Sequence, residues 1–195
     1  QAGVVSMIHC SSSGGGASNW RIDPELARGG IMIDHGWHNL YLLLAMLPEA
    51  PLFIGAKMES APGRTSGLEE TVDLVIGFPQ AEARLHLTWR ADCRRNFGAI
   101  EGERGSVWIN DDHILLSSKG SPPIRYDFPE ALSAGSHHPE WMDCVVEDFS
   151  REIADTRQRG TNLREARQCI ELIELAYRSS REGSCPMALP HPSGS

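Results

Sequence analysis

Residues 29–48 have the sequence GGIMIDHGWHNLYLLLAMLP, an apolar run with a glycine pair in front and a proline behind. Four polar residues interrupt the run in its first turns: Asp34, His35, His38 and Asn39. A helix that is apolar almost all round belongs in the interior of a protein. The run is too short to span a bilayer, which takes about 20 apolar residues. The stretch therefore predicts a buried helix with chemistry at its N-terminal end, because buried polar side chains need partners or a ligand.

Asp34 and His38 stand four residues apart in this predicted helix. That spacing places both side chains on one face, about 6 Å apart along the axis, where the carboxylate can orient the imidazole. An aspartate in a first helical turn is also favoured by the helix dipole whatever its function, and a neighbouring histidine can simply satisfy it. The residue types alone therefore leave a catalytic pair and a structural ion pair both open.

Composition predicts a single globular domain and narrows its partners. The chain has 195 residues, of which 41% are hydrophobic, and this is enough for one domain with a real core. Its formal net charge is -8 and its Lys and Arg residues are scattered, which argues against nucleic acid or an anionic membrane as a partner. Small molecules or proteins are the expected partners.

The cysteines and the first residues of the chain indicate the cellular compartment of the protein. The five cysteines are odd in number, widely spaced and without a CxxC pair, so neither a disulfide framework nor a cysteine-type zinc site is predicted. Reduced thiols and the lack of a recognisable signal peptide predict a cytoplasmic protein. The chain opens on strand-like residues rather than on Met, as expected of a segment cut from a longer protein.

Past the central stretch the hydrophobic period changes from helical to two-residue alternation. In residues 84–91, Leu85, Leu87, Trp89 and Ala91 point one way, which predicts a strand with one buried and one polar face. The predicted strands span residues 3–9, 52–60, 71–78, 84–91, 96–102, 106–110, 113–117 and 124–128, with a short last strand within 187–189. Short, turn-rich links predict hairpins and a largely antiparallel meander.

Two helices are predicted after the strands. The first runs from about residue 139 to 159 and ends at Gly160, and the second runs from residue 162 to a stop at Gly183. Both carry an apolar stripe that is predicted to lie in the core. The stripes are Trp141, Val145, Phe149 and Ile153 in the first helix and Ala166, Ile170, Ile173 and Tyr177 in the second. One domain is expected over residues 1–190, followed by a disordered tail over residues 191–195.

The Gly/Ser-rich residues 11–19 do not predict a phosphate-binding loop. They contain no GxGxxG, no GKS or GKT follows them, and residues 20–24 are not interpreted as a helix start. Trp20 and Arg21, just before the central helix, form either a lid over a site or a surface stacking pair.

Metal and serine chemistry are not predicted either. The spacing of His35 and His38 allows chelation on a helix, and His137 and His138 are adjacent. Neither pair has a third carboxylate or cysteine ligand placed beside it, so no metal site is predicted. No serine lies in a GxSxG elbow.

The assembled order is a strand, a Gly/Ser loop, Trp-Arg, a Gly pair followed by D-x-x-x-H on a helix, a meander of strands and two terminal helices. The stretches that carry the pattern are residues 20–30, 34–38, 102–107 and 165–183. Together they resemble the C-terminal domain of the Gfo/Idh/MocA family of NAD(P)-dependent sugar and polyol oxidoreductases.

The resemblance implies an α+β domain in which one large, mostly antiparallel sheet carries helices on one face. In the family this domain follows a Rossmann domain, and the active site lies in the cleft between the two. The family's catalytic lysine, in an E-K-P motif, and its dinucleotide glycines belong to that preceding domain, and this chain contains none of them. The implied cofactor is NAD or NADP in the full-length protein. The chain alone is expected neither to bind it nor to be active.

The Asp and His of the family match Asp34 and His38. Oxidising an alcohol by hydride transfer requires the hydroxyl proton to leave, and histidine is suited to accept it at neutral pH. His38 is therefore the predicted acid/base, and Asp34 is expected to fix the imidazole tautomer and to contact a substrate hydroxyl. The residues expected to bind the substrate, a sugar, polyol or derivative, are Trp20, Arg21, His35 and Trp37.

Two classes of function stay open at this stage. The first is such an oxidoreductase, of which this chain is the substrate-binding and oligomerisation domain. The second is a non-catalytic, sugar- or cofactor-sensing regulatory protein of the same fold. An E-K-P lysine and a GxGxxG motif upstream in the parent gene would favour the enzyme.

The predicted strand at residues 84–91 also bears on assembly. It leaves Arg84, His86, Thr88 and Arg90 on a face that no predicted helix covers. Members of the family commonly associate through this sheet, so the resemblance implies a homodimer or homotetramer through the open face. The alternative is a monomer whose sheet faces water on one side.

Overall fold

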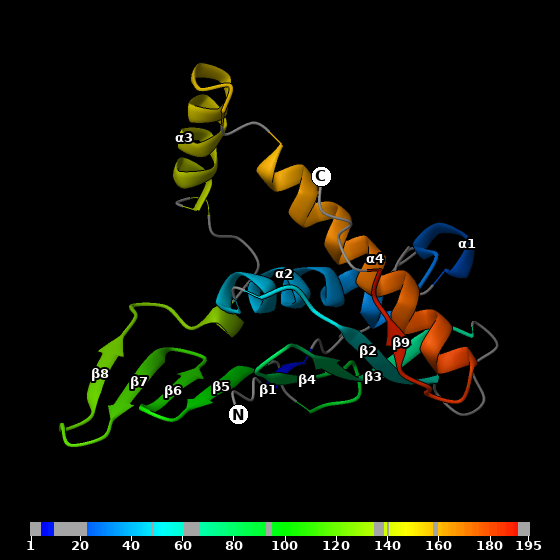
Figure 1. The fold of residues 1–195 in the computed structure, drawn as a ribbon, viewed down its shortest axis with the longest axis horizontal. Coiled ribbons are helices and arrows are strands. Elements are labelled where there is room, and N and C mark those ends of the chain that lie inside the picture. The colour runs from blue at the N-terminus through cyan, green and yellow to red at the C-terminus, as the bar shows by residue number, and fades with distance from the viewer. Residues whose placement is uncertain are drawn as a thin grey trace.

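The computed structural model describes residues 5–9, 23–47, 49–60, 67–92, 95–134, 139, 141–157 and 160–190, with the backbone alone for residues 5–9, 134 and 161. These residues form one sheet and the helices on it (Figure 1). Several predicted features lie outside the described residues, namely the Gly/Ser loop, Trp20, Arg21, His137, His138 and the tail 191–195.

In the described residues, nine strands make one sheet in the spatial order β8-β7-β6-β5-β1-β4-β3-β2-β9. Their bounds are β1 Val5–His9, β2 Phe53–Ser60, β3 Glu69–Gly77, β4 Glu82–Thr88, β5 Asn96–Gly102, β6 Gly105–Asn110, β7 His113–Ser118, β8 Ile124–Asp127 and β9 Met187–Ala188. Neighbouring strands are antiparallel except β1 and β4, which are parallel. The predicted antiparallel meander is confirmed, but β1 lies between β4 and β5 and divides it in two.

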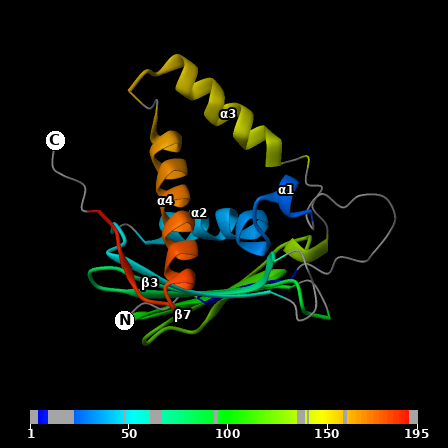
Figure 2. The same cartoon turned by 90° about the vertical axis from the view of Figure 1, so that its right-hand side faces the viewer.

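The helices cover one face of this sheet. Their bounds are α1 Pro24–Ala27, a π-helical turn η2 Met32–Gly36, α2 Trp37–Met46, a 3-10 turn η3 Leu132–Ala134, α3 Trp141–Ala154 and α4 Thr161–Arg181. α2 and α4 lie across the same face, and no helix of the described chain lies on the opposite face (Figures 1 and 2). The predicted α+β arrangement is confirmed.

The core lies between α2, α4 and the strands β2, β3 and β4. Alternate residues of these strands point into it, as a two-residue period dictates. The fully or almost fully buried side chains include Ile54, Val72, Leu74, Ile76, Leu85, Leu87, Leu40, Leu43, Leu172 and Ala176. Ser179 ties the end of α4 to β2, because its Oγ accepts from the Ala56 N–H (2.9 Å) and donates to the Cys185 carbonyl (2.6 Å). Burial of each large apolar side chain contributes about 1.5–3 kcal/mol.

α3 does not reach this core, so the prediction that both terminal stripes are buried was wrong for this helix. The four residues of its predicted stripe have exposed fractions of 54 to 66%. Figures 1 and 2 show the helix standing away from the sheet. The stripe of α4 is buried at Ile173 but half-exposed at Ile170. Periodicity determines which face of a helix is apolar, but it does not determine which surface lies opposite.

The ends of the terminal helices also correct the prediction. α3 ends at Ala154, before the predicted Gly160. The Asp155 carboxylate accepts from the Arg157 N–H (3.0 Å), and such a turn competes with helix continuation. Gly160 instead precedes α4 in a left-handed conformation, with φ 86°. α4 ends just before Gly183, as predicted.

Residues 20–24, not predicted as a helix start, lead into α1. The Asp23 carboxylate accepts from the N–H groups of Glu25 (2.9 Å) and Leu26 (3.4 Å), and Pro24 occupies the first helical position. Both residues are favoured there, because the carboxylate satisfies free N–H groups and proline has none to satisfy. The prediction missed this signal, although the resulting helix has only four residues.

The helix-free face of the sheet is polar over β3 and β4. Arg84 and His86 lie on it, as predicted, and His86 Nδ1 is 2.6 Å from Asp73 Oδ1 on the neighbouring strand. Thr88, predicted to be on the same face, is buried, and its hydroxyl lies 3.0 Å from the hydroxyl of Thr71. The uncovered face is therefore held together by cross-strand polar pairs.

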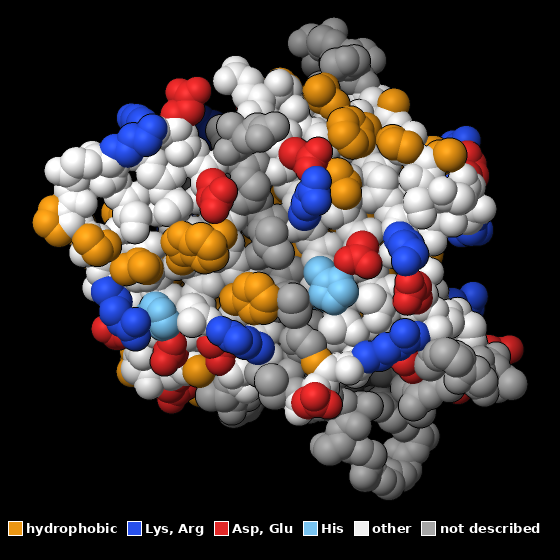
Figure 3. Space-filling view, turned by 90° about the horizontal axis from the view of Figure 1, so that it is seen from below, with side chains coloured by type: hydrophobic (Ala, Val, Ile, Leu, Met, Phe, Trp, Pro, Cys, Tyr) orange, Lys and Arg blue, Asp and Glu red, His pale blue; other side chains and the backbone are white. Residues whose placement is uncertain are grey.

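Toward β8 the same face carries apolar side chains among polar ones. Cross-strand partners lie on the same side of a sheet. The pairing of β4, β1, β5, β6 and β7 therefore places Phe97, Trp108 and Leu115 on the same side as His86. Figure 3 looks at this face, and hydrophobic side chains gather toward its left-hand end, where β5 to β8 lie. Trp108 has an exposed fraction of 50%. The face also carries Arg125 and Asp127 of β8, so it is polar over β3 and β4 and mixed over β5 to β8.

Candidate functional site

The central stretch is not one continuous α-helix. Residues Met32–Gly36 form a π-helical turn, and α2 begins only at Trp37. The predicted burial holds for one face only: Ile31, Met32 and Leu40 have no exposed surface, whereas Ile33, Tyr41, Leu42 and Met46 have exposed fractions of 37 to 53%. The helix type was wrong at the end that carries the polar residues. A π turn contains an extra residue, with hydrogen bonds from residue i to i+5, and such turns are frequent at functional sites.

Glu69, the first residue of β3, holds the start of this turn. Its Oε1 accepts from the N–H groups of Gly30 (2.8 Å) and Met32 (3.1 Å) and from the hydroxyl of Tyr177 on α4 (2.7 Å). The carboxylate thereby satisfies N–H groups that the first turn leaves free, and its charge suits a helix N-terminus. Burial, and next the Glu69 charge, raise the pKa of Tyr177 well above its usual range. The phenol therefore stays a hydrogen-bond donor.

The glycine pair at residues 29–30 is required by this close approach. A Cβ at Gly30 would overlap the backbone of Glu69, and one at Gly29 would overlap the Tyr177 hydroxyl. The sequence signalled this through the paired glycines, because glycine allows close approach of a backbone. The partner that approaches, 39 residues away, carried no recognisable signal.

Asp34 lies in the π turn and pairs with its neighbour His35. The distance between His35 Nε2 and Asp34 Oδ2 is 3.4 Å, and both side chains are mostly buried. The structure thus gives Asp34 a histidine partner that the sequence did not predict. That the Asp34 carboxylate orients the His38 ring stays a prediction.

His38 lies in the first turn of α2 with an exposed side chain. Trp37 before it is half-buried and packs against the core. Asn39 after it is buried, and its side-chain N–H group donates to the carbonyl of His35 (2.9 Å). The structure thus brings Asp34 and His35 together. Among the described residues, none covers the His38 side chain, so a ligand can reach its imidazole. A histidine in this position can accept or give a proton, and a carboxylate can accept from a hydroxyl group.

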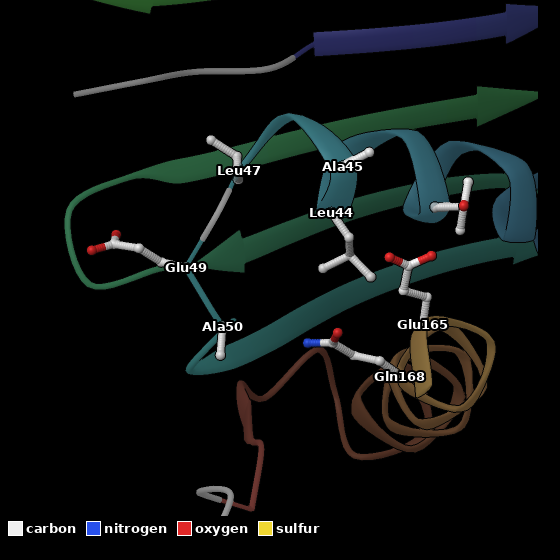
Figure 4. Close-up of a pocket in the computed structure, with 8 residues that line it drawn as sticks. Leu44, Ala45, Leu47, Glu49, Ala50, Glu165 and Gln168 are labelled. Atoms are coloured by element: carbon white, nitrogen blue, oxygen red, sulfur yellow. The ribbon is translucent and has the colours of Figure 1, made fainter. Parts of the chain in front are cut away.

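A cavity at the other end of α2 was not predicted. It lies between the end of α2, residues 47–50 and α4, with a volume of about 230 Å³ (Figure 4). Its lining combines apolar and polar side chains, namely Tyr41, Leu44, Ala45, Leu47, Glu49, Ala50, Glu165 and Gln168. The hydrogen bond with Glu165 raises the pKa of Tyr41. The cavity is formed by segments that meet only in the fold, so local sequence patterns did not indicate it.

The described residues do not form a dinucleotide-binding unit. Between the parallel strands β1 and β4 the chain passes through α1, α2, β2 and β3, whereas a nucleotide-binding unit has a single crossover helix. The described residues therefore contain no such dinucleotide-binding unit for NAD or NADP. Within the same described ranges, no group of three His, Cys, Asp or Glu residues could hold a metal ion. No helix among them has the length and apolar character to cross a membrane.

Comparison with known protein families shows to which family this chain belongs. The model of the GFO/IDH/MocA C-terminal domain matches residues 1–108, which is more than half of the chain. The chain belongs to the GFO/IDH/MocA family. The matched region contains the π turn, α2 and Glu69, whereas Tyr177 and the rest of α4 lie beyond it. No curated protein matches the chain closely enough to count as a relative.

Solved structures with the same fold are those of longer proteins. An aldose-aldose oxidoreductase from Caulobacter crescentus, complexed with glycerol, is 21% identical with a TM-score of 0.76, over 96% of this chain and 55% of that one. A levoglucosan dehydrogenase in complex with NADH is 16% identical with a TM-score of 0.80, over 96% and 58%. An NAD binding oxidoreductase from Klebsiella pneumoniae is 12% identical with a TM-score of 0.80, over 96% and 58%. This chain therefore spans little more than half of the proteins that share its fold.

Proposed function

We propose that this chain is the C-terminal, substrate-binding half of a cytoplasmic NAD(P)-dependent oxidoreductase that transfers a hydride between a nicotinamide cofactor and a sugar, polyol or derivative. Membership of the GFO/IDH/MocA family supports the proposal. The solved structures with this fold include an aldose-aldose oxidoreductase in complex with glycerol and a levoglucosan dehydrogenase in complexes with NADH, L-sorbose and levoglucosan. The cofactor is proposed to lie mainly on the part of the longer protein that precedes this chain, as the family resemblance implies.

The observation that carries the proposal is the placement of the polar residues on the central helix. α2 and its π turn are buried against the sheet over most of their inner face, whereas His38 reaches the surface at their N-terminal end. The partly buried pair of Asp34 and His35 lies one turn before it. A cluster that combines a carboxylate with two imidazoles suits a substrate rich in hydroxyl groups.

His38 is the proposed acid/base. Oxidation of an alcohol to a carbonyl releases a hydride from carbon and a proton from oxygen, and the nicotinamide supplies the hydride chemistry. The proton needs an acceptor within hydrogen-bond reach, and a neutral imidazole is suited to this at physiological pH. The open position of His38 allows a substrate hydroxyl to reach its ring.

Asp34 is the proposed second member of the catalytic set, in a role adjusted to its observed contact. His35 Nε2 lies 3.4 Å from the Asp34 carboxylate, and a carboxylate can accept several hydrogen bonds, including one from a substrate hydroxyl. The further residues proposed to bind substrate are Trp20, Arg21, His35 and Trp37.

We propose in addition that the protein is a homodimer or homotetramer that associates through the helix-free face of its sheet. The apolar side chains of Phe97, Trp108 and Leu115 on that face, of which Trp108 is half-exposed, support this, because aromatic residues beside polar ones are typical of an interface. The reversal of charge at Arg84 and Arg90 should weaken the assembly. Sedimentation of the full-length protein at micromolar concentration measures this, and a wild-type monomer would exclude the assembly.

The function is tested with two samples. Full-length protein that contains this chain is incubated with glycerol, levoglucosan, L-sorbose and common aldoses, and the reduction of NAD⁺ or NADP⁺ is followed. We expect turnover on at least one of them. The isolated chain is titrated with NADH and NADPH by fluorescence, and we expect no binding. Micromolar binding to the isolated chain would contradict the placement of the cofactor. Cofactor binding by the full-length protein without turnover on the whole panel would favour a sensor over an enzyme.

A further inference from the structure

Glu69 is a buried carboxylate that the chemistry proposed above does not use. Its exposed fraction is 6%, and the described structure gives it three hydrogen-bond donors but no Lys, Arg or His partner. A charge removed from water is costly unless hydrogen bonds replace its hydration. Here two backbone N–H groups and one phenol provide them, all on the same oxygen. Glu69 is therefore committed to holding these donors in place.

The three donors belong to segments that are far apart in sequence. Gly30 and Met32 lie at the start of the central helix, Glu69 begins β3, and Tyr177 lies 108 residues beyond Glu69 on α4. One oxygen thus ties the sheet, α4 and the start of the π turn together. Removal of the side chain would leave the donors at the helix start without a partner in the described chain.

The contacts continue from Glu69 to the candidate site. Glu69 accepts from the Gly30 N–H, and the Gly30 carbonyl in turn accepts from the N–H groups of Ile33 and Asp34, both at 3.1 Å. Asp34 is thus two hydrogen bonds away from the buried carboxylate. The backbone of the π turn has little room to shift, because the glycine pair is packed against Glu69 and Tyr177.

We propose that Glu69 is a positioning residue of the site: it fixes the π turn so that Asp34, His35 and His38 are presented in one geometry. The catalytic part of this inference rests on the proposed function. Its physical reason is that a small misplacement of reacting groups, of about 1 Å, can lower a rate by about 10²-fold. A simple N-cap such as serine would satisfy the helix start as well, but it would not link the turn to α4 and β3 at once.

Two variants of the full-length protein separate the effect of the position of the Glu69 carboxylate oxygen from the effect of its charge. Glu69→Asp keeps the charge but withdraws the carboxylate by one methylene group. Glu69→Gln keeps an acceptor oxygen at the original position and removes the charge. Glu70→Asp is the matched control, because this neighbouring carboxylate pairs instead with Arg90 Nε (3.3 Å). Circular dichroism identifies the folded variants for comparison.

The first readout is hydrogen exchange of the amides at residues 30–38, which does not depend on any activity. Glu69→Asp should speed exchange of the Gly30 and Met32 amides by about tenfold or more, as expected when a hydrogen bond to a charged group is lost. Glu69→Gln and Glu70→Asp should change it much less. Unchanged exchange in folded Glu69→Asp would overturn the inference.

The second readout is the division of the effect between kcat and KM on a substrate that the wild-type protein turns over. Glu69→Asp should lower kcat by about 10²-fold with a smaller change in KM, and Glu69→Gln should restore most of the rate. Faster exchange with wild-type kcat would reduce Glu69 to a structural residue and overturn the positioning role. An inactive wild-type protein would count against the proposed function instead, and the exchange measurement would still decide whether Glu69 holds the turn.

Discussion

α3 and α4 follow one another in the chain and carry similar apolar stripes, but their surroundings differ. On α4, Cys169, Leu172 and Ala176 have no exposed surface, because the helix lies over β2 and beside α2. On α3 no residue is buried, and Phe149 in the middle of its stripe has an exposed fraction of 66%. The two helices therefore contribute very differently to the stability of this chain.

The difference shows that an amphipathic period predicts which face of a helix is apolar but does not predict whether that face is buried. A lone helix of about 12–15 residues is marginal in water, and α3 has 14. The described contacts that support α3 are polar, such as the pair of Arg151 with Asp148 (2.7 Å) and the hydrogen bond from Asn162 to Glu152 (2.7 Å). Such exposed pairs contribute little. α4 is instead stabilised by burial, which is the larger effect.

The largest effect is expected for Leu172→Ala on α4. Leu172 is fully buried in the core, so its truncation removes transfer free energy and leaves a cavity. The free energy of unfolding of the 195-residue chain should fall by about 2–5 kcal/mol. Urea unfolding followed by circular dichroism measures this. A loss below about 1 kcal/mol would mean that α4 is not packed as described.

A smaller effect is expected for Tyr177→Phe, which tests the link from α4 to the site. Loss of the hydrogen bond to Glu69 should lower the free energy of unfolding by about 1–2 kcal/mol at neutral pH. Urea unfolding at pH 7 gives this value. An unchanged free energy would contradict the hydrogen bond of 2.7 Å.

The same variant has a signature in alkaline solution. The pKa of Tyr177 is raised in the folded chain, so an unfolded phenol loses its proton first, at about pH 10. The contribution of Tyr177 is then fully present below about pH 10 and is lost as the pH rises toward the folded value. The wild-type chain should lose more stability than Tyr177→Phe above pH 10. The pKa of Tyr41 is raised as well, so the difference between the two chains, rather than either curve alone, isolates Tyr177.

The smallest effect is expected for Phe149→Ser on α3. The side chain is mostly exposed, so the free energy of unfolding should change by no more than about 0.5 kcal/mol. Urea unfolding beside Leu172→Ala provides the contrast directly. A loss comparable to that of Leu172→Ala would show that α3 is packed against the remainder of the chain, and the comparison of the two helices would then fail.

The sequence was sufficient for the fold class and insufficient for the site's geometry. The strands follow from alternation such as that of Leu85 and Leu87, which depends only on neighbouring residues. The helical stretch at residues 29–48 also followed from local pattern. Its π turn did not, because the turn forms against Glu69 and Tyr177, which lie 39 and about 150 residues away from the glycine pair.

The contact of Asp34 shows what a local rule leaves out. The four-residue spacing from His38 drew attention to one possible partner. The structure places the adjacent His35 at 3.4 Å from the Asp34 carboxylate, in a backbone turn that the sequence pattern did not indicate. The family resemblance pointed to this segment, whereas the contacts within it required coordinates.

The most direct test of the central claim is the turnover of His38→Ala in the full-length protein. His113→Ala is the matched control, because this histidine also lies beside a carboxylate, Asp112 (2.6 Å), but on the hairpin of β6 and β7. The account predicts a fall of about 10²- to 10⁴-fold in turnover for His38→Ala, with NADH or NADPH binding nearly unchanged and with wild-type activity in His113→Ala. Wild-type turnover by His38→Ala on the true substrate would contradict it.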